Sequence, residues 1–251
     1  MNELVHYLNE IWTFNMTVAA LVAVPGGLIQ GYAGFGGALI SLPFFVLLFG
    51  PVTGFAMILI VMFLIQASLF PKAVAKADWK EICPLAGASA ITMSLGILFL
   101  VTADPTFIKK GMGVFIILIT LFMISGWRYT GKRRYSVGIT TGAIAGGITG
   151  SFGVAAFPLS ALYFHSSSSG LETIRANVLM ALASNLVVAI VGLAIQGIYQ
   201  PTLIAKALII APIFVCSAFF GQYLFNYAPV NWFKPAVYTI LILSAIALLI
   251  T

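Results

Sequence analysis

The sequence predicts an all-α polytopic membrane protein of about eight to ten helices, arranged as two inverted-topology repeats. Three observations lead to this fold class: the composition, two apolar regions that are too long for one crossing, and a glycine pattern that recurs in the second half. Of the 251 residues, 61% are hydrophobic and 7% are charged, and the mean hydropathy is +1.11. Soluble domains carry about 25% charged residues. The chain has too few charged residues to cover a soluble surface, so we expect an integral membrane protein.

The apolar segments divide into single crossings and longer regions. A transmembrane helix needs about 20 apolar residues. Two regions, 14–50 and 136–165, exceed this length; a continuous helix over 14–50 would extend about 55 Å against a hydrocarbon core of about 30 Å. Each must therefore fold back as a hairpin, whose arms are either full spans or short re-entrant pieces. The single crossings are predicted at 51–71, 82–102, 108–127, 172–195, 203–225 and 231–250.

The basic residues indicate how the chain is oriented. The loops at 72–80 and 128–134 are rich in Lys and Arg, and two predicted spans separate them. They therefore lie on one side, which the positive-inside rule assigns to the cytoplasm. This arrangement places nine of the twelve Lys and Arg residues inside and both termini outside. The net charge of +6 is thus a topology signal, and no nucleic-acid partner is expected.

An internal repeat appears when the chain is shifted against itself by about 116 residues. "GGLIQGYAGFGG" (26–37) then lies over "GAIAGGITGSFG" (142–153), and later "DPTFIKK" (104–110) resembles "APVNWFK" (228–234). The halves, 1–130 and 131–251, each contain a hairpin and three spans, so the second half is predicted to be inverted in the membrane. The matched residues are Gly26 with Gly142, Gly31 with Gly147, Gly34 with Gly150, Gly37 with Gly153 and, after a one-residue slip, Pro43 with Pro158.

The glycines allow two interpretations. Small residues at four-residue spacing let membrane helices pack closely, and Gly27 and Gly31, like Gly142, Gly146 and Gly150, have this spacing. The second interpretation is a helix broken within the membrane. Free N–H groups and the positive dipole end of such a helix bind anions, and glycine lets a ligand approach the backbone. Broken helices in corresponding places of two halves are typical of transporter binding sites.

At these motifs the sequence resembles a known family. "GYAGFGGALISLP" and "GITGSFGVAAFP", once in each half, together with "FIKKGMGVFIILITLFMI", are similar to the TauE/SafE family of bacterial membrane transporters. The resemblance implies export of sulfite or of organosulfonates such as sulfoacetate, across the bacterial inner membrane. The usual motif has a tight glycine cluster like that at Gly36 and Gly37, whereas the second copy reads Ser151-Phe152-Gly153. We therefore expect two half-sites that are not equivalent.

The candidate substrate-binding residues come from both motifs and from two polar residues within spans. Intramembrane polar groups are costly and often functional, although helix–helix hydrogen bonding explains Gln66 and Asn185 equally simply. His165 is either a proton relay or a polar loop residue, and Arg175 either attracts an anion at the inner mouth or marks topology. The full set is Gly34, Phe35, Gly36, Gly37, Pro43, Gln66, Thr149, Gly150, Ser151, Phe152, Gly153, Pro158 and Asn185, with His165 and Arg175 as gating candidates.

The expected function is secondary transport of a small anion by alternating access. No P-loop is present in the sequence, so the chain is not itself expected to hydrolyse ATP. A passive anion channel is the alternative, since the same helix dipoles would line a pore. A serine enzyme built on Ser151 and His165 is disfavoured, because Ser151 replaces Phe35 in a repeated motif and no Ser–His pairing is evident.

Cofactors and metals are not expected, because the two cysteines, Cys83 and Cys216, lack metal-ligand spacing. The expected partners are the lipid bilayer, the anion and a coupling ion, either proton or sodium. The sequence leaves the oligomeric state open.

Overall fold

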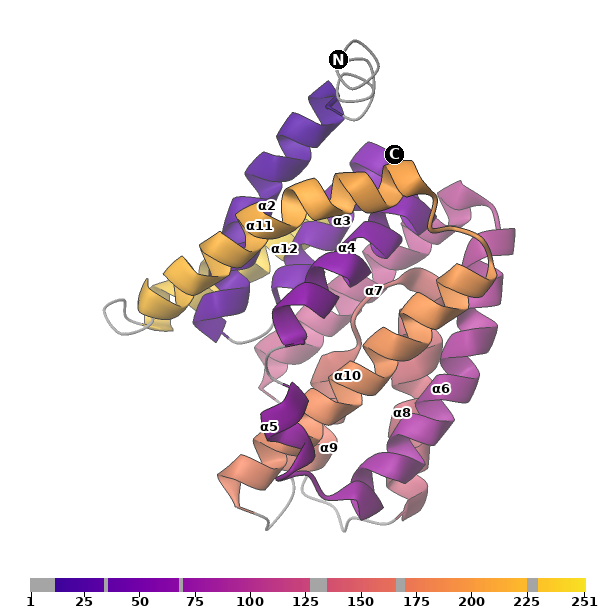
Figure 1. Ribbon diagram of the computed structural model, residues 1–251, viewed down its shortest axis with the longest axis vertical. Helices are drawn as coiled ribbons and strands as arrows, with labels where there is room; N and C mark the ends of the chain where they lie inside the picture. The colour runs from indigo at the N-terminus through magenta and orange to yellow at the C-terminus, as the bar shows by residue number, and fades with distance from the viewer. Residues whose placement is uncertain (1–11, 34–35, 68–69, 127–134, 166–169, 225–229) are drawn as a thin grey trace.

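The computed structural model describes residues 12–33, 36–67, 70–126, 135–165, 170–224 and 230–251. Within these ranges all regular structure is helical (Figure 1). The helices are α2 (Phe14–Ala33), α3 (Gly37–Phe49), α4 (Pro51–Gln66), α5 (Phe70–Val74), α6 (Trp79–Thr102), α7 (Pro105–Ser125), α8 (Tyr135–Phe152), α9 (Phe157–His165), α10 (Leu171–Ile195), α11 (Pro201–Leu224) and α12 (Val230–Ile250).

Five helices in the described part of the chain are long and apolar enough to cross a membrane: α2, α6, α7, α10 and α11. Large apolar side chains also cover much of the outer surface, among them Ile91, Leu95 and Phe219, each at least 65% exposed. Such a surface suits lipid, while the backbone polar groups are satisfied within the helices. The prediction of a polytopic α-helical membrane protein is confirmed.

The first predicted single crossing, 51–71, is wrong at its C-terminal end, because the helix stops before residue 71. The helix α4 stops at Gln66 after 16 residues, a length of about 24 Å. A separate short helix, α5, begins at Phe70. Pro71 accounts for the interruption, because it has no N–H to donate to the carbonyl of Ala67, and in a continuous helix its ring would clash with that carbonyl.

Each long apolar region is divided into two helices, as the length argument predicts. The first region gives α2 and α3, and the second gives α8 and α9. The second arms are short: α3 has 13 residues and α9 has nine, or about 20 and 14 Å against a core of about 30 Å. The break before α3 contains Gly36 with φ 93°, and the break before α9 contains Gly153 with φ 64°. Both second arms are therefore re-entrant in length.

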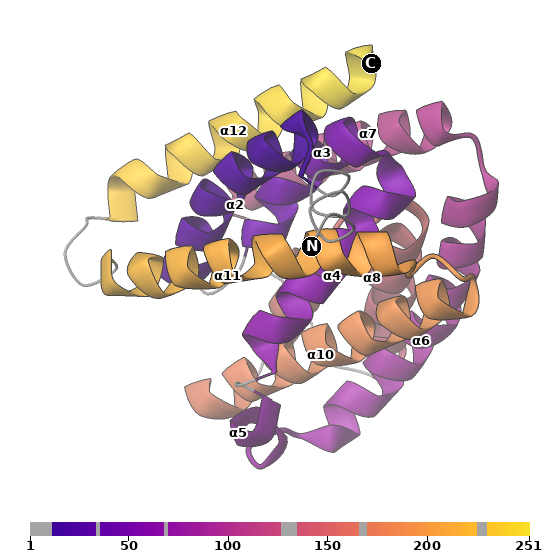
Figure 2. The same cartoon turned by 45° about the horizontal axis from the view of Figure 1, so that its top comes forward.

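The closest helix packing depends on the glycines. In the first half Gly31 of α2 lies against the backbone of Ala218 in α11. In the second half Gly142, Gly146 and Gly150 of α8 lie against the backbone of α6. A Cβ atom at any of these positions would overlap the neighbouring helix, so the packing interpretation is confirmed for them. Figure 2 shows α2 crossing α11, and Figure 1 shows α8 beside α6.

Candidate functional site

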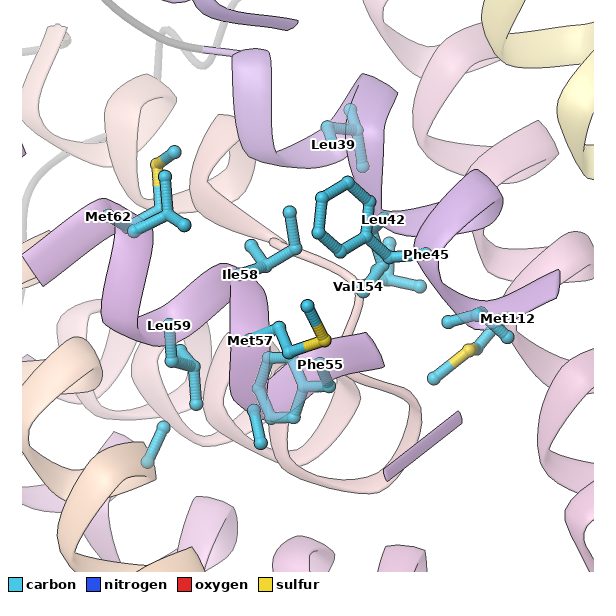
Figure 3. Close-up of a cluster of buried hydrophobic side chains, with 14 of the residues drawn as sticks. Leu39, Leu42, Phe45, Phe55, Met57, Ile58, Leu59, Met62, Met112 and Val154 are labelled. Carbon is cyan, nitrogen blue, oxygen red and sulfur yellow. The ribbon is translucent and has the colours of Figure 1, made fainter. Parts of the chain in front are cut away.

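The described residues enclose a cavity of about 120 Å³, lined from both halves of the chain. Its walls come from α3, α4 and α10, from Gln30 of α2, and from the end of α8 together with the break and the first residue of α9. Figure 3 shows the apolar part, with Leu39 and Leu42 of α3 and Ile58 and Met62 of α4. None of the described residues that line the cavity is charged.

Two helix N-termini meet this cavity. The helix α3 begins beside Gly36 and Ala38, and α9 begins beside Ala156 and Phe157; all four residues line the cavity. Within the described residues, the N–H groups of Ala38 and Leu39 have no acceptor. The first N–H groups of a helix are always left over in this way, and they carry the positive end of the helix dipole. The N-termini of α3 and α9 therefore bring positive dipole ends to the cavity without a basic side chain.

A side chain from the preceding helix bridges each break. The Oε1 atom of Gln30 accepts the N–H of Gly37 at 3.1 Å. The Oγ1 atom of Thr149 accepts the N–H of Ala156 at 3.3 Å. Both bonds span seven residues, and both side chains line the cavity. Thr149 was among the predicted residues, whereas Gln30 was missed, although it stands inside the quoted first motif as a polar side chain in an apolar segment.

Gln66 brings an unpaired polar group to the same space. Its side chain is 9% exposed, and its Oε1 atom is buried without a hydrogen-bond partner. A buried polar atom in this state costs about 1–3 kcal/mol, and most buried polar atoms in proteins are paired. Because Gln66 lines the cavity, a ligand there is a candidate partner for its amide.

Asn185 lies on α10 and also lines the cavity. Its Oδ1 atom accepts a hydrogen bond of 2.7 Å from the hydroxyl of Ser89 on α6. Both interpretations of Asn185 therefore have support, because the residue joins two helices and also borders the cavity. Ser89 was missed by the sequence reasoning, since its partner is 96 residues away.

Five of the predicted binding residues line the cavity: Gly36, Gln66, Thr149, Gly153 and Asn185. Two more, Gly34 and Phe35, lie outside the described residues, as does the side chain of His165.

The other predicted residues are not among those that line the cavity. Gly37 lies against Gly26 and Gln30, and the backbone of Gly150 and Ser151 lies against Gly96 of α6. The ring of Phe152 packs on Phe115 of α7, with 4.8 Å between ring centroids. Pro43 and Pro158 are buried within the protein, and Arg175 is exposed on α10.

Metal ligands do not gather in the described part of the chain: no three His, Cys, Asp or Glu residues there are placed to hold an ion. The donors available at the cavity are backbone N–H groups and side-chain amides. These groups suit an oxyanion.

The fold and the cavity define the class of protein. Helices that break at the wall of an intramembrane cavity, with N-termini facing it, are typical of the binding sites of secondary transporters. A family model described as sulfite exporter TauE/SafE matches residues 19–248, and the chain belongs to this family. The match covers nearly the whole chain and confirms the resemblance of the two glycine motifs; it places the protein among membrane transporters of sulfur anions. Comparison with curated proteins and with solved structures finds no match.

Proposed function

We propose that the protein is a secondary transporter, and an exporter, that binds sulfite or a related organosulfonate in this cavity and moves it by alternating access. The observation that carries the proposal is the meeting of the α3 and α9 N-termini at one cavity. The α3 terminus offers the N–H groups of Ala38 and Leu39, and each terminus brings the positive end of a helix dipole, about half a charge, to an anion. The apolar walls lower the local dielectric constant, which strengthens these interactions.

The walls of the cavity also fit the proposed substrate class. Sulfite is small and needs several hydrogen-bond donors, which the N–H groups of Ala38 and Leu39 and the amide of Asn185 supply. An organosulfonate such as sulfoacetate adds a short carbon chain. The side chains of Leu39, Leu42 and Ile58 offer that chain an apolar surface.

The two halves, 1–130 and 131–251, are proposed to be inverted repeats that rock against one another. The helix contacts support this, because they cross between the halves in matching pairs: α2 of the first half packs on α11 of the second, and α8 of the second packs on α6 of the first. The last helices of the two halves, α7 and α12, pack on each other. Figure 1 shows the two re-entrant helices in different halves of the view, α3 in the upper half and α9 in the lower half.

Sulfite flux from proteoliposomes tests the proposed function. Leu182→Trp places a large ring on the cavity side of α10 and should reduce flux by at least tenfold. Val187→Trp is the matched control, since Val187 lies on the same helix but is 47% exposed on the outer surface. Equal flux in the two variants would contradict the cavity as the route.

The same flux measurements distinguish a carrier from a channel. Flux that saturates with sulfite and responds to an ion gradient supports a carrier, whereas conductance that does not saturate supports the passive anion channel.

A further inference from the structure

We infer that Ser89 is a positioning residue for this cavity: its hydroxyl holds the Asn185 amide with the NH₂ group available to a bound anion. The inference rests on the proposed function and adds a residue to it that does not itself touch the substrate. Ser89 lies in the middle of α6 and is fully buried. None of the sequence patterns singled it out.

The direction of the hydrogen bond fixes the orientation of the amide. The Oγ atom of Ser89 donates to Oδ1 of Asn185 at 2.7 Å. The Nδ2 group of Asn185 has no acceptor among the described residues. An asparagine amide has one acceptor oxygen and two N–H donors. With the oxygen engaged by Ser89, the donors are what Asn185 offers to the cavity that it lines.

The register of α6 and α10 keeps Ser89 opposite Asn185. Both helices run from the end of the molecule that holds α5 toward the other end (Figure 1). Two side-chain contacts join them, and a third links the turn before α6 to α10; the partners are 96 residues apart in each case. These pairs are Lys76 with Glu172 at 2.7 Å, Glu81 with Asn177 at 3.2 Å, and Ser89 with Asn185. The contact of Ser89 with Asn185 is therefore part of a continuous parallel alignment.

A third helix, α8, packs beside Ser89 and leaves room for its hydroxyl group. Gly146 of α8 lies directly against the backbone and the Oγ atom of Ser89. A side chain at position 146 would occupy the space that the hydroxyl needs. One turn further along α8, Thr149 reaches the cavity. The packing of α6 on α8 thus places the Ser89 hydroxyl where its free direction is toward α10.

Orientation decides what the amide does to an anion. With NH₂ toward the cavity, Asn185 donates to the ligand, and a hydrogen bond to a charged group is stronger than one between neutral groups. With the amide reversed, the carbonyl oxygen would face the anion and repel it. Without the Ser89 hydroxyl, both orientations become accessible, and the apparent affinity for an anion falls.

The test is a double-mutant cycle on the purified full-length protein with sulfite as the probe. The variants are Ser89→Ala, Asn185→Ala and the double variant, and the readouts are sulfite-dependent thermal stabilisation and flux. Ser89→Ala and Asn185→Ala should each weaken the apparent affinity by about tenfold. The double variant should bind no more weakly than Asn185→Ala alone, because Ser89 acts through Asn185.

Two further variants separate positioning from packing. Ser94→Ala removes an exposed hydroxyl of α6 that bonds only to the carbonyl of Ala90 in its own helix, at 2.8 Å, so its affinity should match that of the wild type. Ser89→Cys keeps a weaker donor of similar size and should give an affinity between those of the wild type and Ser89→Ala. If Ser89 only packs, Ser89→Ala will lower the melting temperature without sulfite and leave the affinity within twofold of wild type.

The outcomes separate this inference from the proposed function. If wild-type protein binds sulfite and Ser89→Ala binds it equally well, or if the two single effects add in the double variant, the role of Ser89 is wrong and the proposed function stands. If folded wild-type protein binds neither sulfite nor sulfoacetate, the proposed function fails, and the role of Ser89 fails with it.

Discussion

Gly36 and Gly153 both line the cavity, and both have a left-handed backbone, with φ angles of 93° and 64°. Gly36 stands directly before α3, and Gly153 stands directly after α8. Only glycine adopts these angles without steric cost. The same backbone device thus turns the chain at the two breaks, one in each half. The breaks are required by the path of the chain, and they leave the N-termini of α3 and α9 beside the cavity.

Gly153→Val should abolish sulfite transport while leaving membrane insertion intact. A side chain at this φ angle is strained by about 1–2 kcal/mol, and its Cβ atom would lie 3.0 Å from the ring of Phe55 on the opposite cavity wall. Gly37→Val should have the same effect, because its Cβ atom would meet the Gly26 carbonyl. Flux in proteoliposomes and yield in membranes are the measurements. Gly87→Ala is the control, since Gly87 faces open space; transport that survives both valine variants would contradict the broken-helix site.

Two neighbouring glycines of α8 should respond oppositely to alanine. Gly146→Ala should destabilise the protein by about 1–3 kcal/mol, because the added methyl group overlaps Ser89 of α6. Gly147→Ala should leave stability unchanged or raise it, since its Cβ atom would have only Thr92 nearby, at 3.9 Å, and alanine favours helix. Thermal unfolding in detergent measures both. Equal melting temperatures for the two variants would be inconsistent with the packing of α8 on α6.

Asn177→Ala should cost about 2 kcal/mol of stability. This buried side chain accepts the N–H of Asp78 at 2.8 Å and donates to Glu81 at 3.2 Å, and the substitution removes both hydrogen bonds. Glu172→Ala breaks another contact between the same two segments, but the Glu172 carboxylate and the Lys76 ammonium are exposed. The melting temperature of Glu172→Ala should therefore match that of the wild type. A larger loss for Glu172→Ala than for Asn177→Ala would contradict this ranking.

The orientation predicted from the basic loops can be tested by labelling. In a background without Cys83 and Cys216, Asn2→Cys should react with an impermeant maleimide added outside intact cells. Lys132→Cys should react only after the cells are opened. The physical reason is the excess of Lys and Arg on the cytoplasmic side. The reverse labelling pattern would show that the chain is inserted the other way round.

Those features of the fold that depend on the lengths of the apolar segments were predictable from the sequence. The regions 14–50 and 136–165 are too long for one crossing, so a break in each was required, and both occur. The interruption at Gln66 was missed because the run continues to be apolar beyond it, and only Pro71 signals a new helix. The offset of 116 residues paired Gly37 with Gly153, whereas the left-handed glycines at the two breaks are Gly36 and Gly153.

The cavity was predictable only in part, because the sequence does not say which face of a helix meets which neighbour. Gly150 and Ser151 belong to the same motif as Gly153, yet they face α6 and Gly153 faces the cavity. Gln30 and Ser89 act through partners that only the folded chain brings near, seven and 96 residues away. A pattern of residue types carries no information about such contacts.

The central claim is that an anion binds where α3 and α9 begin, and a heavy-atom analogue tests it most directly. Selenite has the charge and shape of sulfite and an atom that scatters anomalously. In a crystal of the protein soaked with selenite, the account predicts an anomalous peak in the cavity, within hydrogen-bonding distance of the Ala38 N–H and the Asn185 amide. A peak confined to the protein surface, with none in the cavity and no competition by sulfite, would contradict the account.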